Sequence, residues 1–215
     1  MTPVDRARQR ARMVEHDLAG RGIRDPAVLA AMEAVPREDF VPAALAGRAY
    51  DDSALPIEAS QTISQPYIVA AMTEAAELGP DDRVLEIGTG SGYGAAVLDA
   101  VAGPVVTVER HHELAESAKQ RLADTGHGDV VVVEGDGSLG WPEGGPYDAI
   151  VVTAAGPTVP RALVDQLADG GRLVIPIGGL HGAQQLVRIR RQGDQAVEED
   201  LGPVAFVPLI GDQGW

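Results

Sequence analysis

From Arg83 onward, short runs of almost wholly apolar residues alternate with segments of helical periodicity. The apolar runs cover residues 83–88, 104–109, 130–137, 147–155 and 170–178, and the helical patterns between them are about 10 to 15 residues long. Strands that are apolar on both faces are typical of parallel sheets covered by helices on both sides. The sequence therefore predicts a doubly wound α/β fold over residues 80–215.

The rest of the chain completes this fold. Residues 184–191 (QQLVRIRR) follow the fifth run after a connector too short for a crossover helix, so we expect an antiparallel strand there. Residues 203–209 (PVAFVPL) predict a last strand, which gives a mostly parallel sheet of seven strands. A further helix is expected over residues 158–168.

Residues 1–79 predict a helical, loop-rich portion that packs with residues 80–215 as one compact unit. We expect helices at its start, over residues 26–35 with Asp25 as N-cap, and over 65–78 with Gly79-Pro80 as the stop. Residues 37–64 show neither helical nor strand periodicity. They predict a long ordered loop with short strands, and long loops of this kind are often functional.

Composition excludes several functions. The 215 residues contain no cysteine, which removes disulfide scaffolds, thiolate nucleophiles and cysteine-bound zinc or iron–sulfur sites. The formal charge of −15 argues against a nucleic-acid partner. No signal-peptide pattern and no apolar run of membrane-spanning length is present, so we expect a cytoplasmic protein with no membrane contact. The histidines lack metal-ligand spacing, so no metal is expected; they are His16, His111, His112, His127 and His181.

The first 24 residues hold six arginines against three acids. Apolar residues at steps of three and four predict an amphipathic helix with the arginines on its outer face; they are Val4, Ala7, Ala11, Val14 and Leu18. This basic face either helps an anionic substrate approach or is a solvated helix surface. We favour the solvated surface.

A glycine cluster follows the first apolar run, in Glu86-Ile87-Gly88-Thr89-Gly90-Ser91-Gly92. Glycines at the junction of a strand and a helix let the backbone approach a ligand closely at the helix N-terminus. A dinucleotide fingerprint fails when it is read from Gly88 but fits when it is read from Gly90 through Gly92 to Ala95. The glycines alone therefore leave two cofactor classes open.

Two acids narrow the choice between these two cofactor classes. Glu109 closes the second apolar run, 21 residues beyond Gly88, where an acid can hold ribose hydroxyls. Asp136 lies between Gly135 and Gly137 after the third run, where its carboxylate can accept from an adenine amino group. Either acid alone could equally cap the next helix. Both acids in register with the glycine cluster predict an S-adenosylmethionine site.

A series of motifs between about residues 30 and 210 resembles one known family. The segments AVPREDFVP (34–42), ALPIEASQTISQPYIVAAMTE (54–74), RVLEIGTGSGYGAAVL (83–98), VTVER (106–110), GDG (135–137), YDAIVVTAA (147–155), GGRLVIPIG (170–178) and VAFVPL (204–209) occur in the order found in protein-L-isoaspartate O-methyltransferases. The chain resembles a bacterial-type member of that family. The resemblance implies a Rossmann-like class I methyltransferase fold, with residues 1–79 covering the substrate and cofactor and residues 80–215 binding S-adenosylmethionine.

The resemblance also implies the site. Ser64 corresponds to the serine taken as catalytic, although helix capping is an alternative role for it. The expected cofactor-binding residues are Gln61, Thr62, Ile63, Glu86, Gly88, Thr89, Gly90, Ser91, Gly92, Glu109, Asp136 and Gly137. The expected acceptor-side residues are Thr153, Ala154 and Ala155.

The implied reaction is methylation of the free α-carboxylate of L-isoaspartyl residues in damaged proteins and peptides, which starts their repair through a succinimide. The family resemblance also suggests a monomer. Two departures lie beside the expected peptide cleft: residues 57–60 replace a glycine-bearing stretch, and Tyr50 stands where Trp is frequent. They leave open a carboxyl methyltransferase dedicated to an aspartate of one peptide or to a small carboxylic acid. A binding module that has lost catalysis is a more remote alternative.

Overall fold

The structure is a computed structural model that describes residues 2–180 and 182–215. Within these residues a seven-stranded sheet has the order β5-β4-β3-β6-β7-β8-β9. Its strands are β3 (Val84–Ile87), β4 (Val105–Glu109), β5 (Val131–Glu134), β6 (Tyr147–Val152), β7 (Leu167–Gly178), β8 (Gln184–Gln192) and β9 (Gln195–Val204). β3 to β7 pair in parallel, and β8 is antiparallel to both of its neighbours. The predicted fold class is confirmed.

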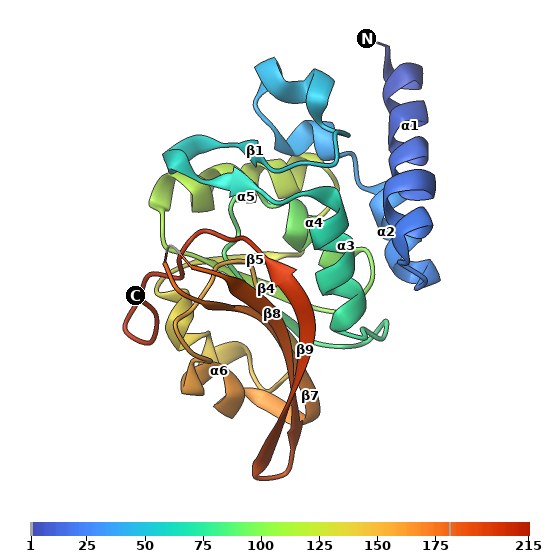
Figure 1. The fold of residues 1–215 in the computed structure, drawn as a ribbon. Coiled ribbons are helices and arrows are strands. Elements are labelled where there is room, and N and C mark those ends of the chain that lie inside the picture. The colour runs from blue at the N-terminus through green and yellow to red at the C-terminus, as the bar shows by residue number, and fades with distance from the viewer. Residues whose placement is uncertain (1, 181) are drawn as a thin grey trace.

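Helices cover both faces of this sheet (Figure 1). They are α1 (Pro3–Arg12), α2 (Pro26–Ala34), α3 (Pro66–Ala75), α4 (Tyr93–Asp99), α5 (His112–Asp124) and α6 (Arg161–Asp165). Successive residues of a strand point to opposite faces, so β3 supplies Val84 to the core under α2–α5 and Leu85 to the core under α6. Both side chains are fully buried. This two-sided burial is the physical reason for the continuous apolar run at β3.

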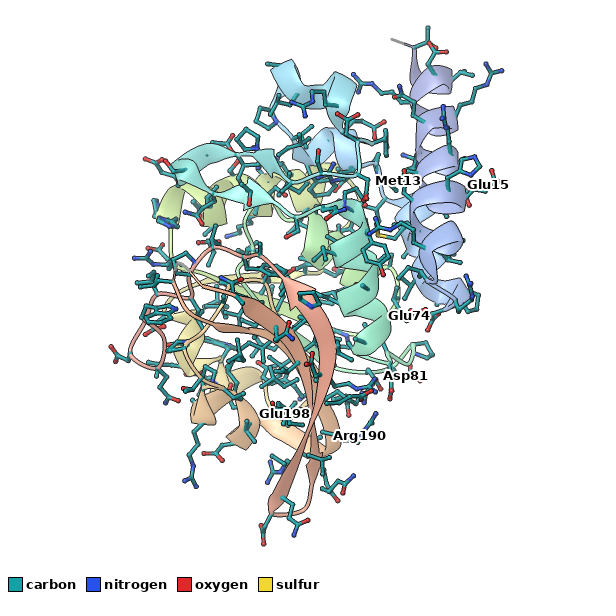
Figure 2. All side chains as sticks on the ribbon, in the orientation of Figure 1. Met13, Glu15, Glu74, Asp81, Arg190 and Glu198 are labelled. Atoms are coloured by element: carbon teal, nitrogen blue, oxygen red, sulfur yellow. The ribbon has the colours of Figure 1, made fainter. Side chains whose placement is uncertain are left out.

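The N-terminal helix packs along only part of its length. After α1 the chain continues as a π-helical turn (Met13–Leu18) and a 3-10 turn (Ala19–Arg21). Met13 and Leu18 are buried, whereas Val4 is 61% exposed, because α1 extends beyond the body of the molecule (Figure 1). Figure 2 shows Met13 pointing toward the body and Glu15 pointing away from it. The predicted apolar face is therefore buried only in its second half.

The start of α2 agrees with the prediction, whereas the end of α3 does not. Asp25 caps α2 as predicted, accepting hydrogen bonds from the backbone N–H groups of Ala27 and Val28. The prediction that Gly79 ends α3 is wrong: α3 ends at Ala75, and Glu77 takes the left-handed conformation at φ 49°. Arg190 and Arg188 bind the Glu77 carboxylate at 2.8 and 2.6 Å. Contacts from the sheet thus fix this helix end.

The predicted loop over residues 37–64 is ordered and built of short pieces. It contains 3-10 turns (Arg37–Phe40, Ala43–Arg48 and Glu58–Ser60) and a two-residue antiparallel pair of β1 (Leu55–Pro56) with β2 (Thr62–Ile63). Its buried side chains share one core cluster with Val84 and Val151 of the sheet. The N-terminal portion therefore does not have a core of its own that is separate from this cluster.

The end of the chain differs from the prediction. β9 occupies Gln195–Val204 and forms a hairpin with β8, so the expected strand over 203–209 is misplaced. Beyond Val204 the chain makes an isolated bridge between Pro208 and Ala155. The helix expected over 158–168 is also shorter, since β7 already begins at Leu167. Among the described residues, no helix is both long and apolar enough to cross a membrane.

Candidate functional site

A cavity of about 690 Å³ opens where β3, β4 and β6 end. Four stretches of chain surround it: the loop after β3, residues 108–111, residues 61–69 before and within α3, and residues 203–210 near the C-terminus. This is the carboxyl edge of the parallel strands, where doubly wound folds bind ligands.

The loop between β3 and α4 forms the floor of the cavity, and four of its predicted residues line it: Gly88, Thr89, Gly90 and Ser91. Gly88 has φ 95°, and a Cβ there would lie 2.3 Å from Thr153 Oγ1, so only glycine fits this position without a shift. The Thr153 hydroxyl donates to the Gly88 carbonyl at 2.8 Å. Gly92 does not line the cavity; it is the N-cap of α4 and faces Leu122 and Ala118 of α5.

Glu86 lies beneath this loop and is completely buried, yet it borders the cavity. Thr107 Oγ1 donates to its Oε2 at 2.6 Å, and Thr107 is in turn 2.7 Å from Thr89 Oγ1. Burial raises the pKa of Glu86 to about 8, against the opposing effect of the Thr107 hydrogen bond. The side chain is therefore mostly a neutral carboxylic acid at pH 7, and it ties the glycine loop to β4.

Glu109 ends β4 at the wall of the cavity, as predicted. Its two oxygens accept from the backbone N–H groups of Gly90 and His111, both at 2.9 Å. Each carboxylate oxygen can accept a second hydrogen bond. Glu109 thus fixes the loop and can still receive the hydroxyl groups of a ribose.

Asp136 and Gly137 have different surroundings. Gly137 lines the cavity, and a Cβ on it would lie 2.4 Å from Ile87 Cγ2. The Asp136 carboxylate does not line the cavity: Oδ1 accepts from the backbone and hydroxyl of Ser138 at 2.9 and 2.7 Å, and Oδ2 accepts from Asp212 N–H at 2.8 Å. Adenine binding by Asp136 stays a prediction, because its carboxylate lies outside the cavity lining and its Oδ1 already accepts two hydrogen bonds.

Ser64 lies between β2 and α3, and it lines the cavity together with Gln61, Thr62 and Ile63. α3 begins at Pro66 with Gln65 as its N-cap, so Ser64 does not have the alternative capping role. Its hydroxyl has no hydrogen-bond partner within the described part of the chain, while its carbonyl accepts from Arg37 Nη2 at 3.0 Å. The hydroxyl is available to a ligand.

The three expected acceptor-side residues at the end of β6 do not all line the cavity. Thr153 and Ala154 line the cavity, but Ala155 does not. Ala155 instead donates its N–H to the Val207 carbonyl at 2.8 Å and accepts from Leu209 N–H at 2.8 Å. It anchors the C-terminal segment that closes the cavity.

Other lining residues escaped the sequence interpretation. Arg21 and Tyr67 line the cavity and stack on each other, with the guanidinium carbon 3.7 Å from the ring centroid. Residues 203–210 also line the cavity, whereas the sequence predicts a strand over residues 203–209 and gives no sign of a cavity-lining role. Tyr50 is not a lining residue, since its hydroxyl donates to Glu38 and accepts from Arg10 at 3.2 Å.

The altered stretch 57–60 lies against the glycine loop. Ile57 Cδ1 is 3.6 Å from the position of a Cβ on Gly90. Ala59 and Ser60 both have left-handed φ values, 54° and 56°, which glycine would adopt with less strain. Arg121 of α5 binds Glu58 at 3.0 Å and holds the turn in place.

No metal centre accompanies this cavity in the described part of the chain, where no three His, Asp or Glu side chains group as metal ligands. Of the five histidines, His181 lies outside the described residues.

Comparisons with known proteins agree with this geometry. The family model of protein-L-isoaspartate(D-aspartate) O-methyltransferase matches residues 8–214. Protein-L-isoaspartate O-methyltransferase 2 of Pelobacter propionicus is 60% identical over 204 residues, which cover 94% of this chain and 91% of the relative. Protein-L-isoaspartate O-methyltransferase 1 of Geotalea uraniireducens is 58% identical over 210 residues, covering 97% and 96%.

Solved structures give the same result. A protein-L-isoaspartate O-methyltransferase superposes with a TM-score of 0.86 at 33% identity, covering 95% of this chain and 67% of the other. A putative enzyme of this kind from Plasmodium falciparum, in complex with S-adenosyl-L-homocysteine, superposes with a TM-score of 0.80 at 25% identity, covering 94% and 98%. Nearly the full length of the chain is matched in sequence and in fold. The chain belongs to the protein-L-isoaspartate(D-aspartate) O-methyltransferase family.

Proposed function

We propose that this protein transfers the methyl group of S-adenosylmethionine to the free α-carboxylate of L-isoaspartyl residues in damaged proteins and peptides. One observation carries the proposal: the glycine loop, the remaining lone pairs of the Glu109 carboxylate and the Ser64 hydroxyl, which has no partner in the described chain, border a single cavity. The family membership supports the same reaction.

The residues present fit the cofactor. The cavity volume of about 690 Å³ lies in the range of small-molecule sites. A backbone cradle at Gly88 and Gly90 leaves room for a ligand where side chains would block it, and Glu109 offers lone pairs to hydroxyl groups. We therefore assign Glu86, Gly88, Thr89, Gly90, Ser91, Glu109 and Gly137 to cofactor binding, with Gln61, Thr62 and Ile63 covering it. Gly92 and Asp136 support this site from outside the cavity.

The chemistry asks for positioning rather than for acid–base catalysis. When bound, S-adenosylmethionine supplies an electrophilic methyl group on a sulfonium. The acceptor carboxylate has an ordinary pKa near 4 and is already an anion at pH 7, so no general base is needed. The Ser64 hydroxyl would donate to one carboxylate oxygen and aim the other at the methyl carbon. Residues 61–65 and 203–210 exclude water, which would stabilise the separated charges. The neighbouring backbone nitrogen then attacks the methyl ester, methanol leaves and a succinimide forms, and hydrolysis of the succinimide returns part of it to aspartate.

The test uses purified protein, labelled S-adenosylmethionine and matched peptides that carry isoaspartyl or aspartyl at one position. We expect label on the isoaspartyl peptide only. Label on the aspartyl peptide would favour the dedicated carboxyl methyltransferase. The altered residues 57–60 beside the glycine loop are the observation that supports this alternative. Label on neither peptide, with the cofactor still bound in calorimetry, would overturn catalysis and leave a binding module.

Ser64→Ala tests the role of its hydroxyl. We expect turnover to fall on the order of 100-fold while the calorimetric affinity for the cofactor stays unchanged. Ser53→Ala is the matched control, since it removes a hydroxyl that is buried without a partner in the described chain and does not line the cavity. A parallel loss of cofactor affinity in Ser64→Ala would mean that the serine holds the cofactor instead.

We further propose that the protein acts as a monomer in the cytoplasm, without nucleic-acid or membrane partners. The net charge of −15 supports the absence of a nucleic-acid partner. Sedimentation of the purified protein and fractionation of cells test these points; a stable dimer or a membrane-bound fraction would contradict them.

A further inference from the structure

Arg37 is a buried cation without an acidic partner. It begins the 3-10 turn Arg37–Phe40 and is 0% exposed. No carboxylate forms an ion pair with it among the described residues, and its Nε has no hydrogen-bond partner. Burial lowers the pKa of the Arg37 guanidinium, which is the direction expected for a cation removed from water.

The guanidinium donates instead to three backbone carbonyls from separate parts of the loop. Nη1 donates to the Ala49 carbonyl, and Nη2 donates to the carbonyls of Ser53 and Ser64 at 3.2 and 3.0 Å. A planar fork of donors suits such a set of contacts, because it fixes the directions of the acceptors as well as their distances. The Arg37 side chain thus links three separate parts of the 37–64 loop.

Ser64 is the member of this set that borders the cavity. The pairing of β1 with β2 holds the chain up to Ile63, and α3 holds it from Pro66. Ser64 lies between these two elements, and the donor that the structure gives to its carbonyl is Arg37 Nη2. The orientation of this peptide unit determines where the Ser64 hydroxyl points.

Arg37 also contacts the other wall of the cavity. Its guanidinium carbon lies 5.8 Å from the ring centroid of Tyr93. Tyr93 is the first residue of α4, directly after the glycine loop; it lines the cavity and packs against Phe40 with ring centroids 5.7 Å apart. The Arg37 side chain therefore contacts both the Ser64 segment and the helix that follows the cofactor loop.

We propose that Arg37 is a positioning residue for methyl transfer, which sets the Ser64 hydroxyl relative to the glycine loop by holding the Ser64 carbonyl. The proposal rests on the proposed function, because it assigns Arg37 an effect through Ser64. A neutral or shorter side chain at position 37 releases the Ser64 carbonyl and lets the hydroxyl turn away from the acceptor. In the described chain no hydrogen bond joins Arg37 to the cofactor cradle at Gly88, Gly90 and Glu109, so we expect the cradle to keep its geometry.

The test is a double-mutant cycle of Arg37→Gln and Ser64→Ala, measured with the isoaspartyl peptide. Arg37→Gln alone should lower kcat on the order of 10- to 100-fold, with KM for the peptide and calorimetric affinity for the cofactor changed by about 3-fold at most. In the Ser64→Ala background the same replacement should lower kcat by about 2-fold at most, because the hydroxyl that it positions is already gone. Arg37→Lys, which keeps the charge and some of the donors, should recover part of the lost kcat.

Arg24→Gln is the matched control. Arg24 also donates to backbone carbonyls, those of Ala19 and Ile23 at 2.6 and 3.2 Å, but it does not line the cavity. Its replacement should leave kcat unchanged. All variants are compared at a temperature below their unfolding midpoints, and Arg37→Lys takes the place of Arg37→Gln in the cycle if the latter does not fold.

Equal losses of kcat in both backgrounds, or a loss of cofactor affinity parallel to the loss of kcat, would overturn the proposal and leave Arg37 a purely structural residue. Failure of the proposed function is seen separately. It would appear as the absence of methyl transfer by the unmodified protein, before any variant is compared.

Discussion

The buried acid Glu86 makes the stability of the protein depend on pH. Its pKa is raised to about 8 by burial, from an ordinary value of 4.5. Between these two values the folded protein holds a proton that the unfolded chain releases, so stability falls as pH rises. Each pKa unit corresponds to about 1.4 kcal/mol. Integration from pH 5 to pH 7.5 gives a loss of about 3 kcal/mol from this one group.

Glu86→Gln removes the titration and keeps an oxygen that can accept from Thr107. The assay is urea unfolding of the ligand-free protein at a series of pH values, with the free energy of unfolding of the variant compared with that of the parent. We expect the difference to change in favour of the variant by about 3 kcal/mol between pH 5 and 7.5. Glu33→Gln, which removes an exposed carboxyl of α2, should follow the parent curve. A constant difference between Glu86→Gln and parent would refute a neutral Glu86.

Three further outcomes test the site and the core. Gly88→Ala should abolish cofactor binding in calorimetry, since its Cβ would lie 2.3 Å from Thr153 Oγ1; Gly126→Ala, with a similar φ of 88° but open space, should not. Glu109→Gln should weaken cofactor affinity about 10- to 100-fold, because an amide N–H₂ would face a backbone donor; unchanged affinity would contradict its role. Leu85→Ala should cost about 2–5 kcal/mol in urea unfolding, as expected for a fully buried leucine, and a cost below about 1 kcal/mol would show that the core collapses around the gap.

The central strands could be predicted from sequence because both of their faces are buried. β3, β4 and β6 start and end within three residues of the predicted runs. β9 could not be predicted in this way, since it lies at the edge of the sheet and carries the exposed acids Glu198, Glu199 and Asp200. Charges on an exposed edge strand oppose association with other chains. Only the pairing with β8 makes this polar segment a strand.

Other misplacements have a tertiary cause. The apolar residues 203–209 resemble a strand, but beyond Val204 they line the cavity instead of continuing a hydrogen-bonded ladder. The end of α3 depends on Arg190 and Arg188, which bind Glu77 from more than 100 positions away in sequence. No local pattern carries information of this kind.

In the candidate site too, local features could be predicted from the sequence, whereas features that depend on tertiary contacts could not. The fingerprint predicted the glycine loop and Glu109, because these residues act through local backbone geometry. The roles of Asp136 and Ala155 depend on distant partners. Asp212, 76 positions away, donates to the Asp136 carboxylate, and Trp215, 60 positions away, donates its indole N–H to the Ala155 carbonyl. A motif cannot show that a later part of the chain already engages its polar groups.

The overall charge of −15 raises the question of how an acidic protein receives an anionic acceptor. Two of the six arginines of the basic N-terminal segment do not answer it, because Arg10 is engaged by Glu38 and Tyr50, and Arg24 by backbone carbonyls. The cavity itself has a different balance. Its charged lining in the described chain consists of Arg110 against Glu109, together with Arg21, whose charge is paired with Asp52; Glu86 is mostly neutral at pH 7. The methyl donor brings a further positive charge. The acceptor carboxylate therefore meets a lining that is not acidic, and the surplus of acids elsewhere acts on it only through solvent, where salt screens it.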